Sequence, residues 1–128
     1  MSTGSNDFDY ESPTVPERAL FVAADEPLLI FPSIIAAERW LEAIDVENGV
    51  YPAAFGPNGE PFAIGTERNR VIIQRTAEPI RPDEFKALLL RYLEAVGQPA
   101  DSSLGLHQIV ATVWARESDF WREHDPIQ

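Results

Sequence analysis

The stretch VYPAAFGPNGEPFAIGTERNRVIIQ, residues 50–74, decides the fold class of the chain. It holds three short apolar runs, at 50–55, 61–65 and 71–74, and polar turns separate them. Strand-like runs joined by turns rich in glycine, proline and asparagine pair as antiparallel neighbours. We therefore predict three consecutive antiparallel strands. Pro52 places the first of them near a sheet edge, because proline cannot donate to a strand ladder.

A second pair of apolar runs lies upstream of this stretch. Residues 19–23, ALFVA, and residues 28–31, LLIF, flank the turn-like sequence ADEP. This pattern predicts a β-hairpin. Together the two regions predict a mostly antiparallel sheet of about five strands.

Three other segments have the apolar spacing of helices. The first begins at Ser33, whose hydroxyl is suited to cap a helix, and ends at Asn48-Gly49. Its apolar stripe consists of Ile34, Ala37, Leu41 and Ile44. The second runs from Pro82, a residue favoured at the first helical position, to a stop at Gly97.

The third helix is predicted to start near residues 101–103. Its stripe consists of Leu106, Ile109, Val110 and Val113, with Trp114 alongside. Glu117 falls in the middle of that stripe, between Val113 and the aromatic pair at 120–121. Either the helix breaks at Ser118, which we favour, or it runs on and uses its terminal aromatics elsewhere.

The predicted element order is β-β-α-β-β-β-α-α. No strand–helix–strand repeat runs through the chain, so a doubly wound parallel sheet is not expected. We predict an α+β domain over residues 18–128, with three helices packed on one face of the sheet. Residues 1–17 are polar and acidic and predict a flexible tail.

The chain is strongly acidic, with a net charge of −11 from 21 acidic and 10 basic residues. The negative charge concentrates in residues 17–67, net −7, whereas residues 68–81 are net +3. Such a surface repels nucleic acid and anionic lipid and suits a basic protein partner. The arginines at 68, 70, 75 and 81 could bind a nucleic acid, but pairing with nearby acids within the chain is the favoured interpretation.

The sequence contains no pattern that indicates catalysis, a metal or a cofactor. It has no cysteine, which excludes disulfides and thiolate chemistry. No Ser lies in a G-x-S-x-G elbow, and we interpret His107 and His124 as structural or exposed residues. We therefore expect a protein that is not an enzyme and needs no cofactor. The absence of an apolar run of ~20 residues and of a signal-peptide pattern leads us to expect a cytoplasmic protein without a membrane span.

Protein binding is the remaining class of function. The segment WLEAIDVENGVY, residues 40–51, places two aromatic residues around a group of acids. Protein interfaces use aromatic anchors inside polar rims. The predicted partner-binding residues are Asp25, Glu26, Trp40, Asp45, Glu47, Tyr51 and Glu60. Trp114, Phe120 and Trp121 form a second candidate set, and for both sets burial in the core is the alternative.

The run from Leu20 to Val96 resembles small immunity proteins of bacterial polymorphic-toxin and contact-dependent secretion systems, such as type VI secretion. The resemblance rests on FVAADEPLLIF, AAERWLEAIDVENGVY, FGPNGEP and VIIQRTAEPIRPDEFKALLLRYLEAVG. It implies a short, acidic, cytoplasmic protein that is encoded beside a toxin. Such a protein binds that cognate toxin, here expected to be basic, and blocks its active site or folding surface.

Two alternatives stay open. The chain could be a small ligand-binding or enzymatic α+β domain, which requires a pocket with converging polar groups near His107 or the arginine-rich strand. It could also be an adaptor or chaperone that binds the targeting region of a secreted effector.

Overall fold

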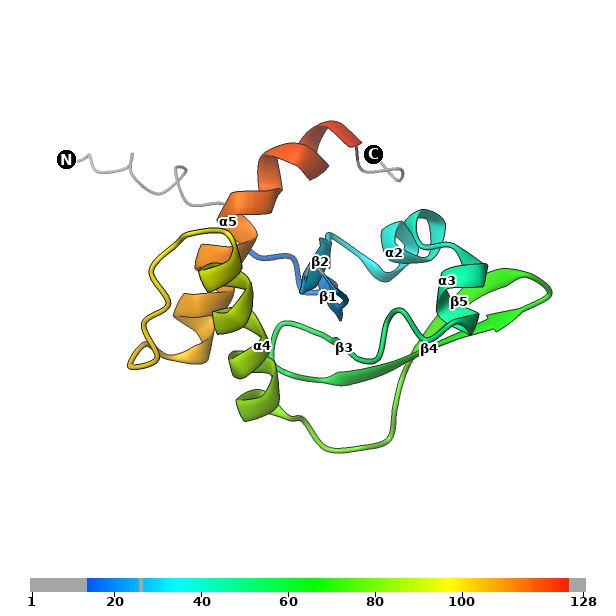
Figure 1. Cartoon of the computed structure of the whole chain (residues 1–128), viewed down its shortest axis with the longest axis horizontal. Coiled ribbons are helices and arrows are strands. Elements are labelled where there is room, and N and C mark those ends of the chain that lie inside the picture. Colours follow the sequence, from blue (N-terminus) through cyan, green and yellow to red (C-terminus); the bar gives the residue numbers. More distant parts are fainter. Residues whose placement is uncertain (1–13, 26, 125–128) are drawn as a thin grey trace.

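The centre of the structure is a five-stranded antiparallel sheet, with strand order β2-β1-β3-β4-β5 (Figure 1). This computed structural model describes residues 14–25 and 27–124. The strands are β1 Leu20–Ala23, β2 Leu28–Phe31, β3 Ala54–Phe55, β4 Pro61–Glu67 and β5 Arg70–Arg75. The α+β class and the five-stranded antiparallel sheet are confirmed. Of the predicted tail, residues 1–13 lie outside the described part, while Val15 is half-buried against the core.

The third strand is shorter and more central than predicted. Only Ala54 and Phe55 pair, with β1 on one side and β4 on the other. The prediction that Pro52 marks a sheet edge was wrong, because Pro52 precedes the paired residues and removes no ladder hydrogen bond. The turn that follows closes through Gly56 N and Glu60 O, 2.8 Å apart. Gly59 adopts φ +90° in this turn, a conformation that favours glycine.

One face of the sheet is covered by helix α4, Pro82–Ala95. Phe21 and Phe55 are register partners on β1 and β3, so they point to the same face. Both rings contact Phe85 of α4, with centroid distances of 5.1 and 5.2 Å. These three rings are buried and form the centre of the core on this face.

Helix α2, Ile34–Trp40, covers the opposite face. Phe31 follows the residue that pairs with Phe21, so its ring points away from α4. It contacts Trp121 of helix α5 at 5.5 Å, and Trp121 in turn contacts Trp40 at the end of α2. Helices therefore pack on both faces, and the predicted placement on one face was wrong.

The segment predicted as one helix after Ser33 forms two. Ser33 caps α2 as expected, because its Oγ accepts a hydrogen bond from Ala36 N at 3.0 Å. At Leu41 the backbone leaves the helical region, with ψ 147°, while its side chain stays buried. A second short helix, α3, spans Ala43–Glu47 and packs against β4 and β5. Ile44, predicted to lie on the core stripe, is 62% exposed because the break rotates the stripe out of register.

Helix α5 runs without interruption over Leu106–His124, so the predicted break at Ser118 was wrong. Glu117 does not disturb the apolar stripe, because Tyr92 of α4 donates a hydrogen bond from its hydroxyl to Glu117 Oε2 at 2.7 Å. Ser118 is buried, and its hydroxyl donates to Ala115 O at 3.2 Å. The helix also starts later than predicted, because Asp101 accepts hydrogen bonds from Ser103 in a turn that precedes it.

Both outer strands of the sheet receive a side chain from a helix. On β2, the carbonyl of Ile30 accepts a hydrogen bond from Trp121 Nε1 at 2.6 Å. On β5, the amide of Ile73 donates to Glu38 Oε2 at 2.8 Å. An outer strand exposes unpaired backbone groups. These two bonds satisfy one such group on each edge and fix α5 and α2 relative to the sheet.

Candidate protein-binding surface

Four of the seven predicted partner-binding residues line a single hollow. Asp25, Trp40, Asp45 and Tyr51 surround an open space of about 460 Å³, which we call the acidic hollow. Its other lining residues are Ala24, Leu29, Glu42 and Val50. Asp25 comes from the turn between β1 and β2, and Trp40 is the last residue of α2. Asp45 and Tyr51 come from the segment that follows α2, so the fold brings these four residues to one place.

Of the other three predicted residues, the two that the structure describes, Glu47 and Glu60, do not line this hollow. Glu26 lies outside the described residues. Glu47 accepts a hydrogen bond from the Thr66 hydroxyl at 3.3 Å, on the side of α3 that meets β4. Glu60 folds back into its own turn, where it accepts hydrogen bonds from Asn58 N at 2.9 Å and Asn58 Nδ2 at 3.3 Å. Glu47 and Glu60 thus have partners within the chain.

The acidic hollow carries a concentrated negative charge. Three of its described lining residues are carboxylates, Asp25, Glu42 and Asp45, and none of the eight is basic. The Tyr51 hydroxyl lies 3.5 Å from Asp45 Oδ2, at the long limit of a hydrogen bond. The hollow is therefore suited to a positively charged group.

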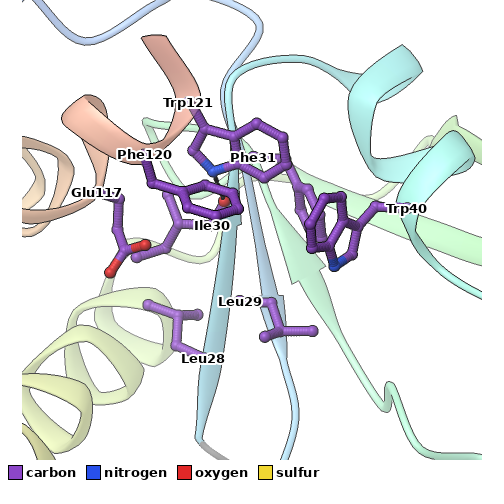
Figure 2. Close-up of a pocket in the computed structure, with 8 residues that line it drawn as sticks. All are labelled: Leu28, Leu29, Ile30, Phe31, Trp40, Glu117, Phe120 and Trp121. Atoms are coloured by element: carbon purple, nitrogen blue, oxygen red, sulfur yellow. Dashed lines mark hydrogen bonds between the residues drawn. The ribbon is translucent and has the colours of Figure 1, made fainter. Parts of the chain in front are cut away.

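A second, apolar depression adjoins the first. The aromatic groove, as we call it, has a volume of about 160 Å³. Figure 2 shows its lining residues, which are Leu28, Leu29, Ile30, Phe31, Trp40, Glu117, Phe120 and Trp121. Leu29 and Trp40 line both depressions. The groove and the acidic hollow therefore form one continuous feature, the Trp40 surface.

The aromatic rings of the groove hold each other in place. Trp40 contacts Trp121 at 5.3 Å and Phe120 at 5.6 Å, and Phe120 contacts Trp121 at 5.0 Å. All three contacts are edge-to-face, a favoured geometry for aromatic pairs. Trp40 is nevertheless 52% exposed and Phe120 is 40% exposed, whereas Trp121 is buried. The groove thus has two exposed rings, those of Trp40 and Phe120. Both contact the buried ring of Trp121, which is itself hydrogen-bonded to the sheet.

The second candidate aromatic set divides between core and surface. Trp114 and Trp121 are buried, so the core interpretation holds for them, and Phe120 faces the groove. Sequence reasoning missed that Phe120 would contact Trp40 and that Glu117 would line the same groove. About eighty positions separate them from Trp40 along the chain, and no local spacing signals a contact over that separation.

Glu117 closes the groove at the end away from the acidic hollow, and Figure 2 shows it and Trp40 on opposite sides of the Phe120 ring. Burial raises the pKa of Tyr92 above its ordinary 10.0, and the hydrogen bond to Glu117 raises it further. A neutral Tyr92 hydroxyl therefore remains the donor that orients this carboxylate.

Another hollow, of about 580 Å³, lies beside His107. Glu17, Asn58 and Glu60 are among its polar lining residues, although Glu60 is engaged in the turn described above. Across the part of the chain that the structure describes, no three His, Cys, Asp or Glu residues are placed to hold a metal ion. The presence of this hollow keeps the ligand-binding alternative open.

The arginine-rich segment divides in two. Arg81 forms ion pairs with Glu78 and Glu84, and Arg75 donates to the carbonyls of Pro61, Thr76 and Glu78. Arg68 lies in the exposed turn between β4 and β5, and Arg70 is the first residue of β5. The favoured interpretation, pairing with nearby acids, therefore describes Arg81, whereas Arg75 binds backbone carbonyls.

Comparison of the chain with known protein families, with curated proteins and with solved structures finds no match. Among residues 14–25 and 27–124, no helix is both long and apolar enough to cross a membrane.

Proposed function

We propose that this protein is an inhibitor of the immunity-protein type, which binds a basic toxin through the Trp40 surface. The observation that carries the proposal is the exposure of Trp40, 52%, between an apolar groove and a hollow with three carboxylates. Tryptophan is enriched among the residues that dominate binding energy at protein interfaces.

The charge of the surface selects the class of partner. Asp25, Glu42 and Asp45 favour a cationic group and repel phosphate. The net charge of −11 extends this preference over a longer range and speeds encounter with a basic protein. A toxin that acts on an anionic substrate needs a basic active site, and such a site is the surface that this protein would cover.

Inhibition of this kind requires binding and no chemistry. An occupied active site excludes its substrate, and the extent of inhibition follows from affinity and concentration. The rigid edge-to-face cluster of Trp40, Phe120 and Trp121 supports such binding, because side chains held before contact lose little conformational freedom on binding.

The test is co-expression of the full chain with the toxin encoded beside it, without the secretion machinery. We expect the chain to restore growth and Trp40→Ala to abolish the rescue. Ile35→Ala is the matched control, because Ile35 is an exposed apolar residue on α2 outside the Trp40 surface. Failure of the wild-type chain to protect would reject the immunity function. It would favour the adaptor alternative if the chain still binds the effector outside its toxic domain.

The ligand-binding or enzymatic alternative has one supporting observation, the hollow of about 580 Å³ beside His107. A small-molecule screen that follows the backbone amide signals of residues 58–60 and 107–110 would test it. A ligand that shifts those signals and leaves the Trp40 indole unchanged would support this alternative.

A further inference from the structure

We propose that the Trp40 surface recognises a partner segment in which an apolar side chain lies close to an arginine. The apolar side chain enters the aromatic groove, and the guanidinium lies against Trp40 and faces the acidic hollow. This inference deepens the proposed function and rests on it for the identity of the partner as a protein.

The size of the groove indicates which apolar side chain of the partner it can hold. A cavity of about 150 Å³ holds a benzene-sized group, and the groove has a volume of about 160 Å³. Apart from Glu117 at one end, its lining side chains are aliphatic or aromatic. One leucine, isoleucine or phenylalanine side chain therefore fits the groove and removes apolar surface from water on both partners.

The position of Trp40 indicates which cationic side chain of the partner binds in the acidic hollow. Its indole lines the groove and also the acidic hollow, so a cation in the hollow lies close to an aromatic ring. A guanidinium stacks on tryptophan and binds carboxylates with several donors, whereas an ammonium is a compact, strongly hydrated charge. An arginine side chain therefore contacts Trp40 and also binds the carboxylates of Asp25, Glu42 and Asp45. A lysine side chain interacts mainly with the negative charge of these carboxylates.

A second copy of this chain is a poorer occupant. A symmetric dimer through the groove would bring two Trp40 surfaces together. Each surface has the three carboxylates of the acidic hollow beside the groove, and each chain has a net charge of −11. Like charges facing each other oppose such a contact. Charge complementarity therefore selects a basic partner segment.

The test uses the full chain, labelled with nitrogen-15, and capped peptides as probes. In one series leucine and arginine are adjacent or separated by one or two glycines. A matched series replaces arginine by citrulline, which keeps the shape and removes the charge. Each peptide is titrated to about 10 mM, well above a Kd of roughly 1 mM. The readout is the indole N–H signal of Trp40, assigned by its loss in Trp40→Phe.

We expect at least one arginine peptide to shift the Trp40 signal, with affinity at least about tenfold above its citrulline counterpart. Asp45→Asn should reduce that difference, and replacement of leucine by glycine should weaken both series. Equal binding of the two series, or no shift of the Trp40 signal with any peptide, would overturn the inference. Circular dichroism and thermal unfolding establish that each variant is folded.

These outcomes separate the inference from the proposed function. Loss of toxin rescue in Trp40→Ala without arginine-selective peptide binding would keep the function and reject the recognition pattern. Arginine-selective binding at Trp40 without any toxin rescue would keep the recognition pattern and reject the immunity function.

Discussion

Two clusters of three aromatic residues lie in different parts of the fold, one on the sheet face under α4 and one along the edge strand β2. Phe85 contacts Phe21 and Phe55 at centroid distances of 5.1 and 5.2 Å. In the second cluster, Trp40, Phe120 and Trp121 contact one another at 5.0, 5.3 and 5.6 Å. The three phenylalanines are buried, whereas Trp40 and Phe120 are exposed. Ring contacts alone therefore do not distinguish a core from an interface. The difference is that α4 covers the first cluster, while the ends of α2 and α5 leave the second partly open.

Of the four substitutions considered, Phe85→Ala is expected to have the largest effect on stability. Phe85 is fully buried and joins Phe21 to Phe55, so its truncation leaves a cavity at the centre of the core. We expect the free energy of unfolding to fall by about 3–5 kcal/mol. Urea denaturation followed by circular dichroism measures this loss. A change below about 1 kcal/mol would show that the phenylalanine cluster is not the core that its burial indicates.

Trp121→Phe tests the ring that belongs to both core and interface. The substitution keeps an aromatic ring but removes the Nε1–H that donates to Ile30 O on the outer strand. We expect a loss of about 1–3 kcal/mol in the free energy of unfolding, because a buried carbonyl loses its partner. Hydrogen exchange of the β2 amides should also become faster. Unchanged exchange would mean that this bond does not hold α5 against the edge.

The Tyr92–Glu117 contact, which closes the groove, gives a pH dependence. The folded-state pKa of Tyr92 is raised above 10.0, so its contribution to stability is fully present below pH 10. That contribution is lost as pH rises from 10 through the raised value. We expect Tyr92→Phe to be less sensitive to this range than the wild type. Unfolding by urea between pH 8 and 11 compares the two proteins, and identical pH profiles would contradict the assignment.

Trp40→Ala should have the smallest effect on stability and a large effect on binding. Its side chain is already 52% exposed, so we expect the free energy of unfolding to fall by about 1 kcal/mol or less. Affinity for the toxin should fall by at least roughly 30-fold, the effect of losing a dominant aromatic anchor. Calorimetric titration measures the affinity. The prediction fails if stability falls as far as in Phe85→Ala while binding persists.

The sequence predicted the fold class because local signals in this chain agree with one another. Turns at 56–60 and 66–69 joined strands that pair as expected, and Ser33, Pro82 and Gly97 mark helix ends where predicted. Glu117 misled the prediction because its spacing within α5 carries no information about Tyr92 on α4. Ile44 misled the prediction because the helix breaks at Leu41 and α3 then packs against β4 and β5. No local sequence pattern signals that break.

The candidate site was likewise predicted in part from the sequence and completed only by the tertiary structure. From the sequence alone, the acidic and aromatic residues of 40–51 could be identified as candidate binding residues. The net negative charge likewise predicted a basic partner. Only the tertiary structure decided that Phe120 contacts Trp40, that Glu117 lines the same groove, and that this groove lies beside the acidic hollow. The physical reason is that spacing along a helix or strand reports which residues share a face. Which faces meet across the sheet depends on packing of the whole chain.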